Sequence, residues 1–175
     1  MSNQHVCKPH AVGMKRAFVL FGLPGSGKTT LGSSLSALLN SPHINADVVR
    51  GSLSKDLGFS EEARMESARR LGVLAALSLC YGPSRTTVVD FVNPTRGTHL
   101  SFLEGMRSVS SEAAEVCPRF VWLNTIPASH CRFQDTAALF DADRLRDPAF
   151  QPHLVIDGRA PTIADRLNLI GKTFF

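Results

Sequence analysis

A glycine-rich segment near the N-terminus constrains this chain more than any other feature of its sequence. The stretch FGLPGSGKTT, residues 21–30, matches the pattern GxxxxGK[ST] at every fixed position. It follows a short apolar run, residues 16–21, and leads into residues 28–39, where apolar side chains recur at helical spacing. In this strand–loop–helix context the motif wraps phosphate groups with backbone N–H groups. The sequence therefore predicts a site for a nucleoside triphosphate.

Two side chains of this loop have expected roles of their own. Lys28 is expected to reach the β- and γ-phosphates, and the Thr29 hydroxyl to bind Mg²⁺. The N-terminus of the following helix adds a favourable field for anions. The predicted nucleotide-binding residues of the loop are Gly22, Pro24, Gly25, Ser26, Gly27, Lys28, Thr29 and Thr30.

Apolar runs and helical periodicities alternate along the rest of the chain. Strands are expected at 16–21, 42–45, 86–91, 119–124 and 153–157, and helices at 28–39, from 47, at 60–81, at 98–109, from 126 and at 161–172. This alternation predicts a three-layer α/β fold with a five-stranded parallel sheet and ligands at the carboxyl ends of its strands. We expect a flexible tail, residues 1–15, then a single domain, residues 16–175, with a mobile lid at about 134–151.

Length and composition fit one globular, cytoplasmic domain. The chain has 175 residues, of which 43% are hydrophobic and 19% charged. Its net charge of +4 suits a small anionic ligand and does not require nucleic acid. No apolar run is long enough for a membrane span, so we expect no membrane partner. The four cysteines are scattered, which favours reduced thiols over a disulfide framework.

An acid and an arginine follow the second expected strand. Asp47 lies at or near its end and Arg50 one helical turn later, so both can face one pocket. Phosphoryl transfer needs a carboxylate to accept the hydroxyl proton and a cation to hold an anionic acceptor, roles that we assign to Asp47 and Arg50 beside the catalytic Lys28. In the alternative, Asp47 caps a helix and Arg50 is a solvated surface residue. Asp90, which ends the third strand, is expected to bind Mg²⁺ with Thr29 and Asp47.

Further candidate residues flank the same pocket. Phe91 and Asn93 follow the third strand in the loop where an acceptor would lie. Phe59 and Arg64 offer an aromatic platform and a second cation, although Phe59 fits a core position equally well. The region WLNTIPASH, residues 122–130, lacks the Lys–Asp pair that is typical of guanine recognition. The pattern therefore favours a phosphotransferase over a switch GTPase.

Two segments resemble the adenylylsulfate (APS) kinase family. DLGFS, residues 56–60, and RMESARRLG, residues 64–72, match segments of that family, and the likeness covers most of the chain after its first fifteen residues. The resemblance implies a P-loop NTPase fold of the nucleoside-kinase type, ATP and Mg²⁺ as cofactors, the 3′-hydroxyl of adenylylsulfate as acceptor, and often a homodimer. It also implies that Arg50, Phe59 and Arg64 hold the adenylylsulfate, with Phe59 stacking on its adenine.

The chain departs from this family at several positions. Asn45 stands where the family has its first acid, Ser67 replaces an acceptor-side Asn, and Val92-Asn93-Pro94 replaces Ile-Ser-Pro. The lysine-rich lid of the family corresponds to residues 135–144, which contain no lysine. The cations left near this lid are Arg132, which we assign to ATP, Arg144 and Arg146.

The spacing Asn45-x-Asp47-x-x-Arg50 also resembles the kinase domain of phage-type polynucleotide kinases, in which a single Asp serves as base. Two alternatives therefore stand beside an APS kinase. One is a kinase of the same fold that acts on another hydroxyl, such as a nucleotide-linked metabolite, a polynucleotide 5′-end or a modified base. Nucleic acid would be a partner only in that case. The other is a nucleotide-binding module that no longer transfers phosphate.

Overall fold

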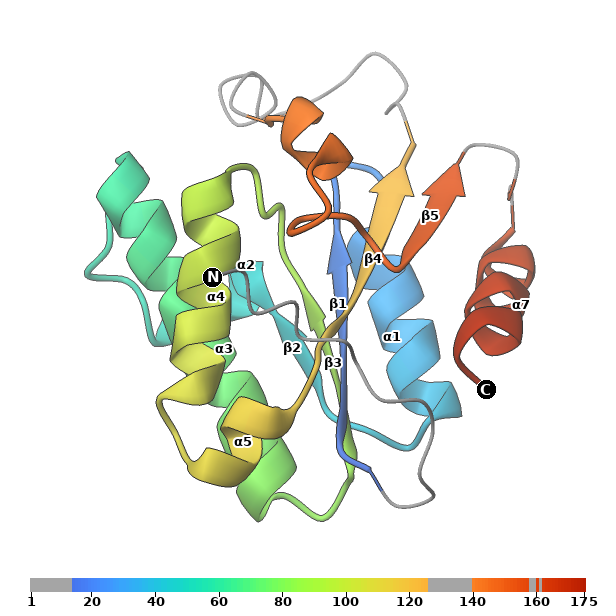
Figure 1. The fold of residues 1–175 in the computed structure, drawn as a ribbon, viewed down its shortest axis with the longest axis horizontal. Helices are drawn as coiled ribbons and strands as arrows, with labels where there is room; N and C mark the ends of the chain where they lie inside the picture. The colour runs from blue at the N-terminus through green and yellow to red at the C-terminus, as the bar shows by residue number, and fades with distance from the viewer. Residues whose placement is uncertain (1–13, 126–139, 158–159, 161) are drawn as a thin grey trace.

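Strands and helices alternate along the chain, as the sequence pattern predicts. The computed structural model describes residues 14–125, 140–157, 160 and 162–175 (Figure 1). In chain order the elements are β1 (Arg16–Phe21), α1 (Lys28–Leu38), β2 (His43–Asn45), α2 (Ala46–Ser52), α3 (Glu61–Tyr81), β3 (Thr86–Asp90), α4 (Arg96–Arg107), α5 (Ser111–Glu115), β4 (Arg119–Asn124), η1 (Asp143–Arg146), β5 (Leu154–Asp157) and α7 (Ile163–Phe174). Every expected strand is present, and its ends differ from the expectation by one residue at most.

The strands form one parallel sheet in the order β2-β3-β1-β4-β5. In this register Asp90 of β3 lies beside Leu20 of β1 on one side and beside Asn45 of β2 on the other. The carboxyl ends of three strands therefore meet at one edge of the sheet, which is where ligands bind in open parallel sheets. The predicted α/β fold with a five-stranded parallel sheet is confirmed.

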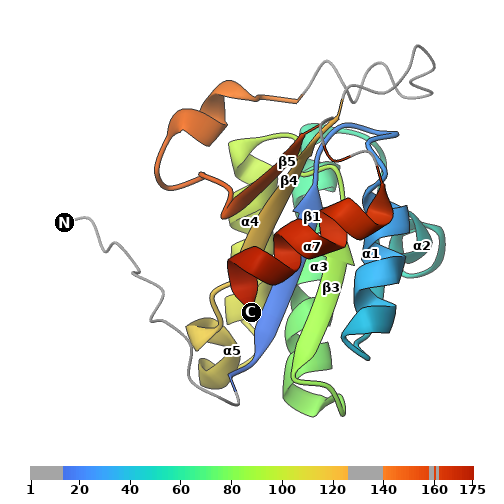
Figure 2. The ribbon, with the colours of Figure 1, turned by 90° about the vertical axis from the view of Figure 1, so that its right-hand side faces the viewer.

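Helices cover both faces of this sheet (Figures 1 and 2). Side chains of β1 alternate between the two faces. Phe18 and Leu20 pack with α1 and α7 on one face, whereas Val19 and Phe21 pack with α3 and α4 on the other. All four side chains are fully buried. Burial on both faces explains why the segment RAFVLF is apolar at nearly every position.

Side-chain caps fix where the helices near the sheet edge begin. Asn45 is the N-cap of α2 and Ser60 the N-cap of α3, and each accepts a hydrogen bond from the backbone N–H three residues later. Thr95 and Thr162 begin α4 and α7 with capping boxes. The cap of α2 is therefore Asn45 and not Asp47.

Some features of the fold differ from the expectation or lie beyond it. The sequence pattern misses α5 and η1, which have five and four residues and are too short to show a period. The helix expected from residue 126 lies outside the described residues, as does the tail except for residues 14 and 15. Within the described ranges, no helix is both long and apolar enough to cross a bilayer.

Residues 140–151, the described part of the expected lid, pack against the start of α4. The backbone N–H of Asp141 donates to the carbonyl of Pro94 at 2.9 Å. Arg96 forms an ion pair with Asp147 at 3.0 Å. The segment thus contacts the loop that follows β3, at the same edge of the sheet as the phosphate loop. Its mobility stays a prediction.

Cys117 corrects one expectation. This residue is disulfide-bonded, whereas Cys80 is free. Wide spacing in the sequence is a poor guide to pairing because folding brings distant segments together. The expectation that the cysteines are all reduced is therefore wrong for Cys117.

Candidate functional site

The glycine-rich loop leaves the carboxyl end of β1 and turns into α1. Gly22 and Gly27 have φ angles of 146° and 87°, which side chains disfavour. A Cβ on Gly22 would lie only 2.5 Å from the carbonyl oxygen of Leu123, so the close approach to β4 requires glycine. Lys28 Nζ donates to the carbonyl of Leu23 at 2.7 Å and lies over the loop. The predicted loop residues that line the cleft are Pro24, Gly25, Gly27, Lys28, Thr29 and Thr30.

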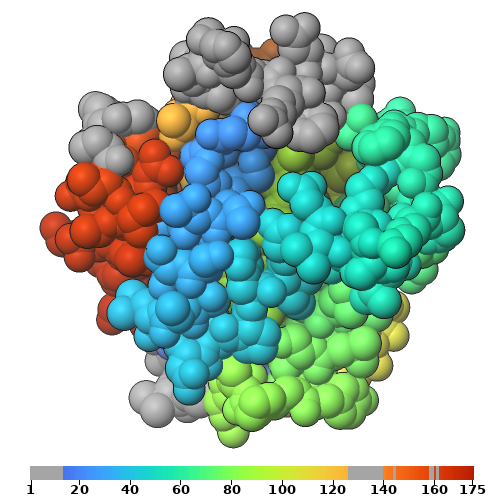
Figure 3. Space-filling model, turned by 180° about the vertical axis from the view of Figure 1, so that it is seen from behind, coloured from blue at the N-terminus to red at the C-terminus, as the bar shows by residue number. Residues whose placement is uncertain are grey.

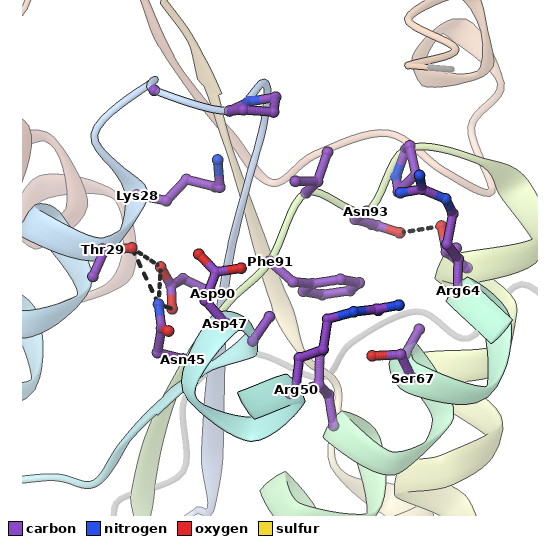
Figure 4. Close-up of a pocket in the computed structure, with 18 of the residues that line it drawn as sticks. Lys28, Thr29, Asn45, Asp47, Arg50, Arg64, Ser67, Asp90, Phe91 and Asn93 are labelled. Atoms are coloured by element: carbon purple, nitrogen blue, oxygen red, sulfur yellow. Dashed lines mark hydrogen bonds between the residues drawn. The ribbon is translucent and has the colours of Figure 1, made fainter. Parts of the chain in front are cut away.

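A cluster of polar side chains lies at the sheet edge beside the loop (Figure 4). Thr29 Oγ1 donates to Asp90 Oδ2 at 2.7 Å. Asn45 Nδ2 donates to the two oxygens of Asp90 at 2.9 and 3.2 Å and to Thr29 Oγ1 at 3.1 Å. His43 Nε2 lies 3.1 Å from Asp90 Oδ1. Asp90 is 2% exposed, and a buried carboxylate needs such partners.

This cluster has the chemistry of a magnesium site. The Thr29 hydroxyl and the Asp90 carboxylate provide oxygen ligands, which Mg²⁺ prefers, and the structure brings them together as predicted. Among the described residues, no three His, Cys, Asp or Glu side chains form a metal-binding group. Mg²⁺ does not need such a group, because it is usually bound by one or two carboxylates together with phosphates.

Asn45 and His43 support Asp90 from β2. Alternate residues of a strand point to the same side, and the register places Asn45 next to Asp90. Every polar atom of the Asn45 side chain bonds within the protein: Oδ1 caps α2, and Nδ2 binds Asp90 and Thr29. Asn45 is thus part of the framework of the cluster. Sequence reasoning missed His43, although its position two residues before Asn45 carried the signal.

Asp47 lies in the first turn of α2 and lines the cleft at the border of the phosphate loop. Its side chain is exposed, and Figure 4 shows its carboxylate turned into the cleft. Since Asn45 caps the helix, the capping role considered for Asp47 is already filled. A solvated carboxylate in this position is available to accept a proton.

Two arginines, one from α2 and one from α3, lie beside an exposed aromatic ring in the connection between these helices. The Arg50 guanidinium donates to the carbonyls of Leu57, at 3.4 Å, and Gly58, and lies 4.3 Å from the ring centroid of Phe59. Arg64 Nε donates to the carbonyl of Phe59 at 3.0 Å. Phe59 is 71% exposed, which excludes the core position that its sequence context allowed. All three side chains line the cleft.

An ion-pair network anchors this connection to α3. Arg70 donates twice to the Asp56 carboxylate, at 2.7 Å each, and once to Glu66 at 2.9 Å. Arg69 donates to both oxygens of Glu66, at 2.7 and 2.9 Å. Hydrogen bonds from Arg69, with a further contribution from Arg70, lower the pKa of Glu66 from 4.5 to about 2. The DLGFS segment is therefore tied by charge to the helix that follows it.

Phe91, Asn93 and Ser67 line the other wall. Phe91 stacks on Phe102 with ring centroids 5.4 Å apart. Asn93 is fully buried at a φ of 48°, a left-handed conformation that Asn tolerates, and its Oδ1 accepts from Thr98 Oγ1 at 3.1 Å. Ser67 reaches the same space from α3. The structure thus places all of the described substrate-site candidates in one cleft.

This cleft has a volume of about 540 Å³ and joins the two groups of predicted residues. Figure 3 shows it as a hollow between the blue phosphate-loop region and the teal α2–α3 region. The predicted ATP contact Arg132 lies outside the described residues. Arg146 is exposed, pairs with Asp143 at 3.4 Å and is not among the lining residues.

The parallel sheet, the phosphate loop and the adjoining cleft define a P-loop nucleotide-binding domain. The sequence profile of the adenylylsulphate kinase family matches residues 15–145, three quarters of the chain. The chain belongs to this family.

Individual relatives agree with this assignment. Over 138 residues the chain is 34% identical to the bifunctional enzyme NodQ of Rhizobium sp. (strain BR816). The matched region covers 75% of this chain and 20% of NodQ. Over 87 residues it is 40% identical to the adenylyl-sulfate kinase of Chloroflexus aurantiacus (strain ATCC 29364 / DSM 637 / Y-400-fl), covering 47% of this chain and 46% of the relative. These matches span less than half the length of either relative.

A solved structure shows the same fold. The Mycobacterium tuberculosis APS kinase CysC, in complex with AMPPNP and APS, aligns with a TM-score of 0.68. The alignment covers 91% of this chain and 97% of that chain, at 21% sequence identity. The structural alignment therefore reaches beyond residue 145, where the match to the family profile ends.

Proposed function

We propose that the protein transfers the γ-phosphate of ATP to the 3′-hydroxyl of adenylylsulfate. The observation that carries the proposal is a single cleft in which a phosphate loop faces two arginines and an exposed phenylalanine, with Asp47 at the border. An aromatic ring suits an adenine, and guanidinium groups suit the anionic part of such an acceptor. Membership of the adenylylsulfate kinase family supports the same activity.

Three side chains carry the proposed transfer. Lys28 and the N-terminus of α1 stabilise the negative charge of the transferred group, which is the largest contribution in reactions of this kind. Asp47 accepts the proton of the attacking hydroxyl, and Arg50 holds the acceptor through its anionic groups. Arg50 is suited to this task because backbone carbonyls and the Phe59 ring already fix its guanidinium.

Thr29 and Asp90 fit the Mg²⁺ that accompanies ATP, and the sequence adds Asp47 as a third candidate. Bound there, Mg²⁺ supplies charge neutralisation at the phosphates. Asn45 and His43 orient the Asp90 carboxylate, so that its oxygens stay at the sheet edge next to Thr29. Supporting contacts of this type commonly tune a metal site.

A second candidate is a kinase of the same fold that acts on another hydroxyl. One observation favours it: Asn45 stands in the place of the family's first acid and is fully engaged with Asp90 and Thr29. The acceptor would then be another nucleotide-linked metabolite, a polynucleotide 5′-end or a modified base. The third possibility, nucleotide binding without transfer, predicts binding of ATP and no turnover of any acceptor.

An ATP-consumption screen tests these functions. The acceptors are adenylylsulfate, other nucleotides, 5′-hydroxyl oligonucleotides and sugar alcohols, each with wild type and with Lys28→Ala. We expect wild type to show its highest kcat/KM with adenylylsulfate. In Lys28→Ala this kcat/KM should fall by several orders of magnitude. A higher kcat/KM for another acceptor would replace the first candidate by the second.

We also propose a homodimer in the cytoplasm. The homodimer follows from the family resemblance, and the cytoplasm supplies ATP, the proposed donor. Sedimentation velocity over a range of protein concentrations measures the oligomeric state. A monomer at all concentrations would contradict the dimer without affecting the proposed chemistry.

A further inference from the structure

Arg166 is a buried cation on the last helix to which no role has been given. It lies in α7, beyond the residues that match the family profile, and is 9% exposed. Ile170 and Phe174 of the same helix belong to the core between α7, α1 and the sheet, and Ile163 packs against them. Helical spacing puts Arg166 on this inward side. Burying a guanidinium is unfavourable unless hydrogen bonds compensate, so its position calls for a physical reason.

The described hydrogen bonds of Arg166 link α7 to the phosphate loop. Nε donates to the carbonyl of Ala160 at 3.0 Å, and Nη1 donates to the carbonyl of Ser26 at 3.3 Å. A Cβ on Gly27 would lie 2.9 Å from Nη1, so the guanidinium also packs directly on the loop. Both acceptors are backbone carbonyls and not carboxylates. Neither acceptor therefore brings a negative charge to the guanidinium behind the loop.

The bond to Ser26 restrains one peptide unit of the loop. In a trans peptide the C=O and the following N–H point in opposite directions. Arg166 holds the Ser26 carbonyl toward α7, which turns the Gly27 N–H toward the opposite side, where Gly27 lines the cleft. Glycine by itself has little preference for such an orientation. A charged donor gives a stronger restraint than a neutral one.

We infer that Arg166 is a positioning residue for triphosphate binding. From α7 it holds the Ser26–Gly27 peptide so that the loop presents its N–H groups to the phosphates, and its charge attracts them from behind. The inference rests on the proposed function, because it requires that the loop binds a triphosphate. If Arg166 acts in this way, the packing of α7 against the phosphate loop helps to set the affinity for the nucleotide.

Titration calorimetry on the full chain tests this inference with two probes, AMPPNP and inorganic tripolyphosphate. Arg166→Met keeps the apolar stem but removes the charge and both hydrogen bonds, and Arg166→Lys keeps the charge. Lys172→Met is the matched control, since Lys172 is an exposed cation in the last turn of the same helix. We expect Arg166→Met to weaken both probes by roughly ten- to a hundredfold, Arg166→Lys by less, and Lys172→Met by under about twofold.

Two further measurements separate positioning from a structural role. Added guanidinium should restore part of the AMPPNP affinity of Arg166→Met, and adenylylsulfate should bind this variant within about threefold of wild type, a difference under about 1 kcal/mol. Equal losses for AMPPNP and adenylylsulfate, a lowered Tm and no rescue would overturn the inference. Unchanged affinity for both probes in Arg166→Met would overturn it as well.

The remaining outcomes are also decisive. If Arg166→Met does not fold, Arg166→Lys carries the test: several-fold weaker binding of AMPPNP at unchanged Tm supports the inference, and unchanged binding overturns it. If wild type binds neither probe, the proposed function fails and this inference with it. If wild type binds both and the Arg166 variants match it, only this inference fails.

Discussion

Asp90 ends β3 with its carboxylate held by side chains from two other elements. Thr29 comes from α1, and Asn45 and His43 come from β2. These partners replace the water that a buried carboxylate loses. Asn45 supplies its hydrogen bonds without adding a charge. This cluster therefore holds one carboxylate, that of Asp90, whereas the family pattern would add another acid at position 45. The main physical consequence of Asn45 is thus a lower negative charge in the cluster.

Replacing Asn45 by Asp should make the protein depend on Mg²⁺ for stability. An Asp at this position still caps α2. It also places two carboxylates about 3 Å apart, since Asn45 Nδ2 lies 2.9 Å from Asp90 Oδ1, and such a pair raises the pKa of one acid unless a cation lies between. We expect Asn45→Asp to lower Tm by roughly 2–8 °C in EDTA and by less with Mg²⁺.

Asn45→Ser is the control, because Ser retains a capping oxygen and brings no charge. An equal Tm loss in Asn45→Ser, with no effect of Mg²⁺, would contradict the electrostatic explanation. The same variants separate the two candidate functions. In an APS kinase the restored acid should preserve or raise kcat/KM for adenylylsulfate, whereas in a kinase for another hydroxyl it should weaken transfer.

Asp47→Asn should slow transfer strongly while leaving nucleotide binding intact. The amide has nearly the same size but accepts no proton, and general base catalysis contributes roughly 100- to 10,000-fold in rate. We expect kcat to fall within that range and the Kd for AMPPNP to stay within about threefold, a difference under about 1 kcal/mol. Glu115→Gln is the control, since it removes an exposed carboxylate in α5, away from the cleft. Full activity in Asp47→Asn would show that another group takes the proton.

At the scale of elements, the connection between α2 and α3 depends on ion pairs for its shape. Arg70 joins Asp56, within this connection, to Glu66 on α3. The carbonyls that hold Arg50 and the exposed ring of Phe59 belong to the same connection. The network therefore links the start of α3 to the acceptor half of the cleft.

Glu66→Gln should change how stability depends on pH. The pKa of Glu66 falls from 4.5 to about 2 on folding. A depressed pKa in the folded state adds stability above the unfolded value, and this stability is lost as pH falls toward the folded value. We expect Glu66→Gln to be less stable than wild type at pH 7, with a difference that shrinks between pH 4.5 and 2. Urea unfolding across this range measures it.

The control for this prediction is again Glu115→Gln, whose carboxylate is outside the network. A constant difference between wild type and Glu66→Gln at every pH would contradict the ionic explanation and favour a packing effect. The variant should also raise KM for the acceptor more than KM for ATP, because the network supports Arg50 and Phe59.

Sequence patterns predicted the elements better than the contacts between them. Strands such as RAFVLF are evident because burial on both faces demands apolar residues, and GxxxxGK[ST] fixes backbone geometry as well as chemistry. The contact of Arg166 with Ser26 joins residues far apart in the chain, and no local pattern encodes it. His99 is a similar case: its ring stacks on Phe120 and its Nδ1 lies 3.4 Å from Asn93 Nδ2, and neither period nor motif marks it.

At the scale of the whole molecule, the cleft is lined by residues from helices on opposite faces of the sheet. Helix α1, which follows the phosphate loop, packs on one face of the sheet, and α3 and α4 pack on the other. The segment 140–151 contacts the loop between β3 and α4, where Asn93 lines the cleft. Phe150 of this segment is buried and meets His99 edge to face. Movement of the segment would therefore act on the acceptor wall.

Hydrogen exchange should reveal ligand-dependent closure over residues 134–151. Lids open for exchange of ligands and close to exclude water, so we expect faster exchange here than in the sheet without ligand. AMPPNP with adenylylsulfate should slow it, while peptides from β1 stay unchanged. Lys28→Ala is the matched control: its weakened phosphate contacts should reduce the slowing at equal ligand concentration. Exchange as slow as in β1 before ligand is added would show instead that the contacts of Asp141, Asp147 and Phe150 hold the segment closed permanently, and a lid would then be excluded.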